Sequence, residues 1–302
     1  MVIVVGFVFF ALGGLKLGIE FRGGSTLDIQ ITGKDVSQQD LSLALDNLGY
    51  QDAIVQRLGG GGEGEFFIRT RAITSTDEKQ ALEDGLRTEL GLEGDQLKEL
   101  SFDSVTALVA RETIRNAAIA VAVGWLAILV YVAIAFRNMP HPFVYSAAAI
   151  IALIHDVLIA VGVFAILGKL LDWEVNSMLI VAILAIIGFS INDTIVVYDR
   201  IREHLKQGKH ANFHEVVNAA MTQTMTRSLN TSITVLIANV AVYLFIGAEI
   251  RDFSVAMLVG VVSGTYSSIF IASHLVVVWE DGKWRKYVPN LPGLRGLRTK
   301  TA

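Results

Sequence analysis

The sequence predicts an α-helical membrane protein with six transmembrane helices and a small external α+β domain between the first two. Of its 302 residues, 53% are hydrophobic and 18% are charged, and the mean hydropathy is +0.53. This composition is too apolar for an ordinary soluble domain and too charged for a chain made only of spans. Six apolar runs are long enough to cross a bilayer core of roughly 30 Å, which takes about 20 helical residues.

The six predicted spans set the domain boundaries. The first occupies residues 1–17 and is short; a signal peptide is the alternative, but no basic residue precedes the apolar run and no convincing cleavage site follows it. The other five form a helical bundle within residues 113–280, and a basic tail follows at 281–302. These five spans are expected at Ile114–Phe136, Phe143–Leu167, Ser177–Tyr198, Met225–Ile246 and Phe253–Trp279.

Basic residues predict the orientation of the chain in the membrane. The loop Asp199–His214 carries four Lys or Arg residues, and the tail after Trp279 carries six. The positive-inside rule places both in the cytoplasm, together with the N-terminus of a six-span protein. Residues 18–112, with eighteen acidic and nine basic residues, are then external. Cysteine is absent, so neither disulfides nor thiolate metal sites are available.

The segment 18–112 has the patterns of a small water-soluble fold. Alternating or β-rich stretches predict strands, and apolar residues at helical spacing predict two helices. The expected elements are a strand at Ser25–Thr32, a helix at Val36–Gly49, strands at Gln51–Leu58 and Glu65–Thr70, a helix at Thr74–Leu90 and a strand at Asp95–Phe102. This β-α-β-β-α-β order is that of a ferredoxin-like unit. The run GGGGEG between the middle strands lacks a following Lys-Ser/Thr, so it is interpreted as a flexible turn and not as a nucleotide loop.

Four ionisable residues lie inside the predicted membrane region. Asp193 is about six residues inside the cytoplasmic boundary near Asp199, roughly 9 Å deep, and Arg227 lies at a similar depth in the antiparallel fifth span. We therefore expect the two to meet as an ion pair. His155 and Asp156 lie near the middle of the third span. Each charge at the bilayer centre costs on the order of 3 kcal/mol on insertion scales, so these residues require an explanation.

The residues around Arg227 form a polar stripe along the inner half of the fifth span. Asn230 or Thr231, and then Thr234, follow Arg227 at helical spacing. Two interpretations remain open. In the first, Asp193 and Arg227 form a static pair that fixes helix register, and Asp156 is held by neighbouring hydroxyls or amides. In the second, the acids exchange protons, and the polar stripe admits water.

The sixth span carries a helix-packing pattern. Gly260, Gly264 and Ser268 recur every four residues, which is the small-xxx-small spacing that lets helices approach closely. Packing against another helix is the expected role of these residues.

Motifs along almost the whole chain resemble the SecF family, the smaller half of SecDF protein-translocation accessory complexes and a relative of the RND transporters. The motifs are GIEFRGGS after the first span, ALIHDVLIA in the third, IIGFSINDTIVVYDRIRE in the fourth, TRSLNTSIT in the fifth and VGVVSGTYSSIFIAS in the sixth. The family's S-[IL]-N-D-[TS] motif falls on Ser190, Asn192 and Asp193, its fifth-span arginine on Arg227, and the acid of its His-Asp-Val motif on Asp156.

The resemblance implies a function and a set of partners. It implies a bacterial inner-membrane subunit that pairs with a SecD half and assists preprotein export through the Sec channel, SecYEG, using the proton gradient. The proton-coupling residues would be Asp193, Arg227 and Asp156. The supporting polar residues would be Ser190, Asn192, His155, Asn230, Thr231 and Thr234. Membrane lipids would surround the chain, and no nucleic acid, cofactor or metal is implied.

Other functions were weighed against this one. The runner-up is an RND-like proton-driven exporter of small molecules or lipids, although an external domain of about 90 residues offers little room for a substrate pocket. A purely structural scaffold predicts that neutralising Asp193 has no effect. An enzyme is not expected, because the chain has no HExxH motif, no nucleotide loop and no recognisable Ser–His triad. Proton or sodium coupling, and a separate subunit or half of a fused SecDF chain, both remain open.

Overall fold

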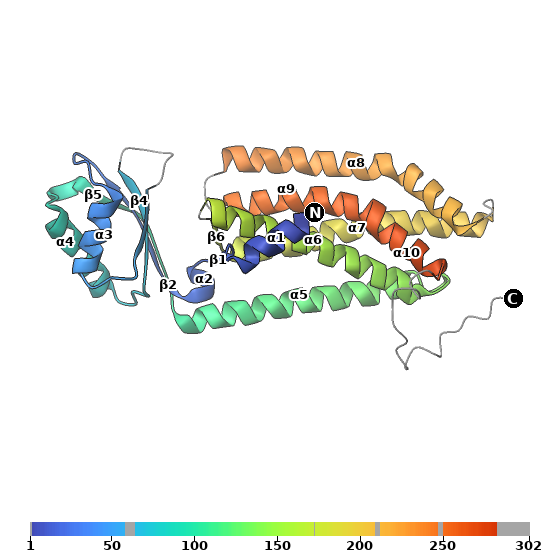
Figure 1. Ribbon diagram of the computed structural model, residues 1–302, viewed down its shortest axis with the longest axis horizontal. Coiled ribbons are helices and arrows are strands. Elements are labelled where there is room, and N and C mark those ends of the chain that lie inside the picture. The colour runs from blue at the N-terminus through green and yellow to red at the C-terminus, as the bar shows by residue number, and fades with distance from the viewer. Residues whose placement is uncertain (1, 58–63, 172, 209–211, 247–249, 283–302) are drawn as a thin grey trace. The chain divides into compact units, whose positions relative to one another are not determined.

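A computed structural model describes residues 2–57, 64–171, 173–208, 212–246 and 250–282 of the chain (Figure 1). It separates into two compact units. Unit 1 comprises Met1–Leu15, Ala120–Trp173 and Met178–Ala302, and unit 2 comprises Lys16–Ile119 and Glu174–Ser177. Most of the predicted glycine-rich turn lies outside the described residues.

Unit 1 is a bundle of long apolar helices. Five described helical segments are long and apolar enough to cross a membrane. They are α5 (Ala107–Ala135, which begins in unit 2), α6 (Pro142–Leu170), α7 (Ser177–Gln207), α8 (Phe213–Phe245), and a last segment composed of α9 (Arg251–Tyr266), the π-helical turn η3 (Ser267–Ala272) and α10 (Ser273–Glu280). The last segment is the most enclosed, with 61% of its most apolar stretch buried, whereas only 6% of that stretch of α5 is buried.

The first predicted span, residues 1–17, is wrong in its extent. Helix α1 (Val2–Ala11) has ten residues, too few to be counted among the five long helices. The reason lies in two glycines. Gly13 adopts a φ of 73°, a left-handed conformation that ends the helix, and Gly14 lies so close to α6 that a Cβ atom would be 2.2 Å from the Ala165 carbonyl oxygen.

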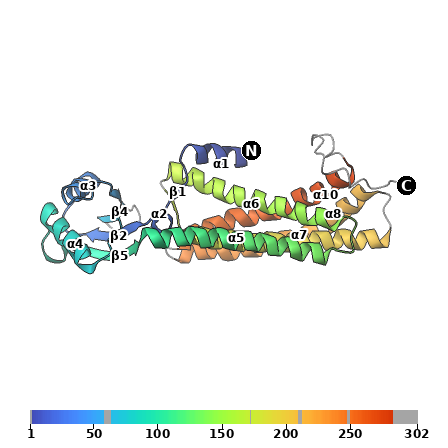
Figure 2. The same cartoon turned by 90° about the horizontal axis from the view of Figure 1, so that it is seen from below.

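Helix α1 lies along α6, as Figures 1 and 2 both show. The two backbones approach each other at Gly6 and Gly162, where a Cβ built on Gly6 would be only 2.6 Å from the Gly162 Cα. Close approach through small residues increases dispersion contacts between helices, which drive association where no hydrophobic effect operates. The α1–α6 pair therefore depends on the absence of side chains at both glycines.

Unit 2 is built around a four-stranded antiparallel sheet in the order β3-β4-β2-β5. This is the strand order of a ferredoxin-like unit. The strands are β2 (Gly24–Ile31), β3 (Ile54–Arg57), β4 (Glu65–Thr70) and β5 (Leu97–Val105), the helices are α3 (Gln38–Asn47) and α4 (Thr76–Leu90), and the short turn η1 (Gly94–Gln96) precedes β5.

The core of unit 2 forms between its helices and one face of the sheet. Inward-facing residues of the central strands alternate with less buried ones and pack against apolar residues of both helices; among them are Leu27, Ile29, Phe66, Leu41 and Leu86, each 0–1% exposed. The sequence predicts both helix starts because Ser side chains cap them. Ser37 and Asp40 form a reciprocal capping box on α3, and Ser75 accepts a hydrogen bond from the Glu78 amide on α4.

A small second sheet in unit 2 connects distant parts of the chain. Strand β1 (Lys16–Leu17) pairs in parallel with β6 (Glu174–Val175), and α2 (Ile19–Arg22) follows β1. The Glu20 carboxylate accepts a hydrogen bond from the Ser177 amide at the start of α7, and Arg69 forms an ion pair with Glu174. The segment before α7 is therefore fixed to unit 2 by backbone and side-chain bonds.

Candidate intramembrane polar site

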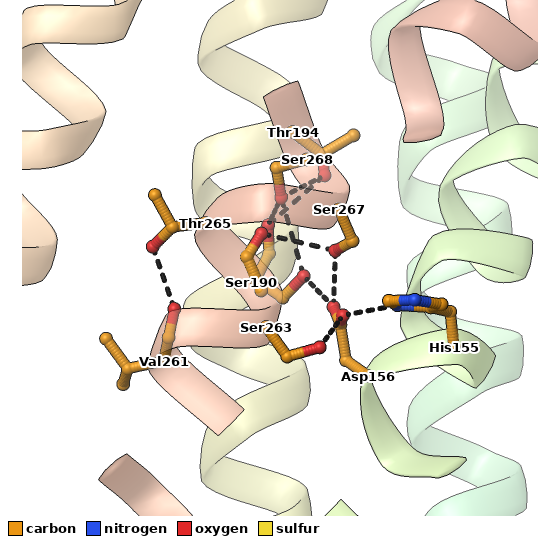
Figure 3. Close-up of polar contacts among 10 residues, drawn as sticks. His155, Asp156, Ser190, Thr194, Val261, Ser263, Thr265, Ser267 and Ser268 are labelled. Carbon is orange, nitrogen blue, oxygen red and sulfur yellow. Dashed lines mark hydrogen bonds and ion pairs between the residues drawn. The ribbon is translucent and has the colours of Figure 1, made fainter. Parts of the chain in front are cut away.

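The centre of unit 1 contains a fully buried carboxylate, Asp156 on α6. Three hydroxyl groups donate to it: Ser190 Oγ at 2.7 Å and Ser267 Oγ at 2.6 Å to Oδ2, and Ser263 Oγ at 2.7 Å to Oδ1. His155 Nδ1 lies 3.1 Å from Oδ1. Figure 3 shows these groups converging on the carboxylate from three helical segments. We call these five residues the Asp156 cluster.

The π-helical turn η3 explains how one segment supplies so many hydroxyls. A π turn contains more residues than an α turn, so each residue is rotated less from the one before it. Consecutive serines in η3 can therefore both face the neighbouring helices. Ser267 donates to Asp156, while Ser268 donates to the Ser190 carbonyl oxygen at 2.9 Å and accepts from Thr194 Oγ1 at 2.8 Å (Figure 3).

The hydrogen bonds of the Asp156 cluster offset the burial of its charge. Moving an acid away from water is costly unless its oxygens accept hydrogen bonds, and bonds to a charged group are each worth about 1.5–3 kcal/mol. Each oxygen of Asp156 has two partners. The arrangement accommodates a buried acid and joins α6, α7 and the last helical segment at one point.

Asp193 lies on α7 in a different environment. It is 3% exposed, and its Oδ2 atom is buried without a hydrogen-bond partner among the described residues. Its polar neighbours on α8 are Ser228 and Arg227. The Ser228 hydroxyl is itself buried without a partner in the part of the chain that the structure describes. Asp193 is therefore an enclosed acid with unused hydrogen-bonding capacity.

The ion pair expected between Asp193 and Arg227 is absent from the described residues. No nitrogen of Arg227 lies within 4.0 Å of an Asp193 oxygen among the described ion pairs, and Arg227 is exposed. The physical reason is the rotation of α8 about its axis. Matching depth brings the two residues to the same level, but Ser228, one position further along the chain, occupies the inward face instead.

The other predicted polar residues separate into inward-facing and outward-facing groups. Ser190 and His155 belong to the Asp156 cluster. Asn192 is exposed on α7, and Asn230 and Thr234 are exposed on α8. On α8, Thr231 donates to the Arg227 carbonyl oxygen at 3.0 Å, and Thr234 donates to the Thr231 carbonyl oxygen at 2.8 Å. The stripe around Arg227 is therefore largely exposed in this chain.

The residues of the sixth-span packing pattern all lie against α7. A Cβ on Gly260 would meet Ile186, with the closest atom at 2.2 Å, and a Cβ on Gly264 would lie 3.0 Å from Ser190 Cβ. Ser268 bonds the Ser190 backbone. Small residues at these positions bring η3 close enough to α7 for the hydroxyl bonds to form.

Sequence reasoning missed four hydroxyl residues of the site: Thr194, Ser228, Ser263 and Ser267. The sequence gives only a weak indication of these residues, because a serine or threonine in an apolar helix can hydrogen-bond the carbonyl of its own preceding turn and need not contact another helix. The run of hydroxyl and glycine residues in VSGTYSS was the available clue. Among the described residues, no group of three or more His, Asp and Glu side chains is placed to hold a metal ion.

A bundle of long apolar helices with enclosed acids defines a multi-pass membrane protein. A family model described as "Protein export membrane protein SecD/SecF, C-terminal" matches residues 88–282. The protein translocase subunits SecF of Thermobaculum terrenum and Anaerolinea thermophila are 43% and 37% identical to the chain. The alignments cover 93% and 94% of this chain and 90% and 91% of those proteins. The chain belongs to the SecF family of protein translocase subunits.

A solved structure agrees with this assignment. The crystal structure of SecDF from Thermus thermophilus, described as a translocon-associated membrane protein, matches with a TM-score of 0.76 and 33% identity. The match covers 93% of this chain and 37% of that one, so this chain spans little more than a third of the SecDF polypeptide. As a translocase subunit of this family, the chain is a transport component and not a classical enzyme.

Proposed function

We propose that this chain pairs with a SecD subunit, or with a SecD half, and assists preprotein export through the Sec channel using proton flow across the membrane. Asp193 is the proton-responsive residue. The observation that carries the proposal is the enclosed Asp193 Oδ2 atom, which has no hydrogen-bond partner among the described residues. A static ion pair would require a partner for this oxygen, and Arg227 does not supply one.

The proposed cycle uses two arrangements of α7 and α8. When Asp193 is ionised, it attracts Arg227, and the buried Ser228 hydroxyl is available as a donor. When a proton neutralises Asp193, Arg227 interacts instead with water or with Asn230, Thr231 and Thr234. A difference in contacts between two protonation states is what shifts a conformational equilibrium. Exchange between these arrangements would transmit proton uptake to the rest of the complex.

Asp156 has a supporting role in this proposal. Its oxygens are already occupied by four donors. It therefore holds α6, α7 and η3 together beside Asp193, which follows Ser190 by less than one helical turn. This refines the expectation that Asp156 carries protons itself: its hydrogen bonds favour a fixed anchor.

The external placement of unit 2 and its contact with unfolded preprotein are further parts of the proposal. Strands β3 and β5 form the two edges of its sheet. An edge strand has unpaired backbone groups that can accept an extended peptide. The nine-residue β5 is the longer edge, and Leu100 on it is 47% exposed.

Preprotein translocation into vesicles that contain the Sec channel, SecD and this chain tests the proposal. Under an imposed proton gradient, we expect Asp193→Asn to insert and assemble normally but to lose gradient-driven export, and Asp193→Glu to keep part of it. Asn218→Ala is the matched control, because Asn218 is exposed on α8 and lies outside the predicted site. Export by Asp193→Asn at the wild-type rate would favour the static interpretation. A sodium gradient imposed at constant pH separates sodium coupling from proton coupling.

A further inference from the structure

An open cavity of about 630 Å³ lies between α5, α7 and α8 in unit 1. Its walls combine two kinds of side chain. Tyr131 and Ala135 of α5, Phe136 just after it, and Ile195 and Val196 of α7 are aromatic or apolar. The remaining lining is strongly polar and includes three arginines, Arg200, Arg202 and Arg227. The cavity is therefore apolar on one side and cationic on the other.

Two of the three arginines, Arg200 and Arg202, are held by side-chain contacts. Arg200 Nε donates to Gln223 Oε1 on α8 at 2.6 Å, and its guanidinium forms an ion pair with Glu203. Arg202 forms an ion pair with Asp199, and its guanidinium carbon lies 5.7 Å from the centre of the Phe136 ring. Arg227 has no ion pair among the described residues. Three arginines and two acids give the lining a net charge of about +1, with one guanidinium not engaged by an acid.

The cavity lies where the apolar stretch of α7 gives way to charged residues. The apolar stretch of α7 ends at Tyr198, and the charged residues of the cavity begin at Asp199. Tyr131 of α5, 57% exposed, lies at the same cavity. Tyrosine is enriched at membrane–water boundaries, where its ring is in the apolar layer and its hydroxyl reaches the polar one. Leu129, Val130 and Ile134 of α5 are 36–59% exposed and add apolar surface on the same helix.

We propose that this cavity binds the phosphate headgroup of one anionic phospholipid. Arginine presents several N–H donors in a fixed plane that matches phosphate oxygens, and basic pockets between transmembrane helices bind anionic headgroups. The acyl chains lie along the exposed apolar surface of α5. A free phosphate ion would use the arginines alone, whereas a lipid uses both sides of the cavity, so the mixed lining favours the lipid. The proposal does not depend on proton coupling at Asp193.

Native mass spectrometry of the full chain in detergent tests the proposal with three probes: dioleoyl phosphatidylglycerol, dioleoyl phosphatidylcholine and inorganic phosphate. We expect one phosphatidylglycerol to bind at least tenfold more tightly than phosphatidylcholine. The double variant Arg200→Gln, Arg202→Gln should lose about tenfold in phosphatidylglycerol affinity, which corresponds to about 1.4 kcal/mol. Arg137→Gln is the matched control, because Arg137 is exposed just after α5 but does not line the cavity.

A second variant keeps the test decisive if the double variant folds poorly. Glu203→Gln removes the acid that competes for Arg200, so it should bind phosphatidylglycerol more tightly than the wild type. Equal affinity for the two lipids, or an equal loss in Arg137→Gln, would overturn the proposal. Displacement of phosphatidylglycerol by an equal concentration of inorganic phosphate would identify a free-anion site instead. Loss of bound lipid when SecD is added would identify the cavity as a subunit interface, which also contradicts the proposal.

Discussion

Ser267 contributes one of the shortest hydrogen bonds of the Asp156 cluster, and it does so from a π-helical turn. Its hydroxyl replaces part of the hydration that the buried acid has lost. Two other serines and a histidine complete the cluster, so the removal of one hydroxyl leaves a buried oxygen with fewer donors. The energetic consequence should exceed that of removing a serine that bonds only its own helix.

We therefore predict that Ser267→Ala destabilises the chain by about 1.5–3 kcal/mol, because a buried carboxylate loses a charge-assisted bond. Thermal unfolding in detergent measures the difference. Ser146→Ala is the control: Ser146 is equally buried, but its hydroxyl donates at 3.3 Å to the Pro142 carbonyl of its own helix. Equal destabilisation by the two substitutions would show that the hydrogen bond to Asp156 contributes no more to stability than the bond within one helix.

Asp28 of unit 2 is the residue for which a pH dependence follows from the structure. It lies on the less buried face of β2, and its Oδ1 atom has no hydrogen-bond partner among the described residues. Partial burial raises the pKa of Asp28 above its ordinary value of 3.8, and the negative charges of Asp103 and Glu65 add to this effect. The folded protein then holds the proton more tightly than the unfolded chain does.

The sign of the effect on stability follows from proton linkage. Between the ordinary and the raised pKa, the folded state binds more protons, so the free energy of unfolding decreases as pH rises through this window. We predict that Asp28→Asn removes this decrease and stabilises unit 2 at neutral pH. Amide hydrogen exchange of β2 and β5 in the full chain, corrected for the intrinsic effect of pH, reports the change. Asp52→Asn, at an exposed loop position, should retain the wild-type pH dependence.

At the scale of helices, glycine determines which pairs come close. Helix α1 contacts α6 through Gly6 and Gly162, and the last segment contacts α7 through Gly260 and Gly264. In the first pair the neighbouring atoms are backbone, which cannot rotate away. In the second the closest atoms belong to the Ile186 side chain, which has other rotamers available. The two contacts should therefore differ in their tolerance of a methyl group.

We predict that Gly6→Ala destabilises the α1–α6 contact by about 1–3 kcal/mol, the usual penalty for overpacking. Its new Cβ would lie 2.6 Å from Gly162 Cα, so the helices must separate. Gly188→Ala on α7 is the matched control, because no atom lies within 4 Å of its added Cβ. There the substitution should be neutral or stabilising, because alanine favours a helix more than glycine does. Thermal unfolding of both variants in one detergent compares them directly, and equal shifts would contradict the packing argument.

At the scale of the whole molecule, the exposed surface of unit 1 indicates a missing partner. Only 17% of the most apolar stretch of α8 is buried. The exposed side of α8 includes Asn230 and Thr234. Polar residues in a membrane face protein or water and are costly against lipid. A second subunit that covers this face would supply polar contacts that the chain itself lacks.

We predict that this chain forms a stable complex with a SecD subunit and that α8 contributes to the interface. Substituting Asn230 and Thr234 together by leucine should weaken co-purification of the two subunits, because polar contacts across the interface are lost. A double substitution of Ile119 and Val123 on the exposed surface of α5 by leucine is an apolar control. Purification of the chain as a monomer with full export-assisting activity would contradict the prediction.

The sequence by itself determined the class of protein, the family and much of the local structure. Apolar runs long enough to cross a bilayer predict the five long helices of the described residues. Three of them, α6, α7 and the last segment, begin close to their expected positions, whereas α5 and α8 begin earlier and α7 ends later than expected. Hydropathy and strand alternation are local properties of the sequence, so they can be recognised without knowledge of the fold. The capping serines of α3 and α4 are predictable for the same reason, since their bonds lie within one helical turn.

The tertiary structure decided which side chains meet. The sequence placed Asp193 and Arg227 at matching depth, but only the rotation of α8 about its axis determines that Ser228, and not Arg227, faces inward. The convergence of Ser190, Ser263 and Ser267 on Asp156 depends on three segments and on a π turn that no residue pattern specifies. Depth in the membrane follows from counting residues along one helix, whereas contacts between helices depend on their relative rotation and spacing, which arise from packing the whole bundle at once.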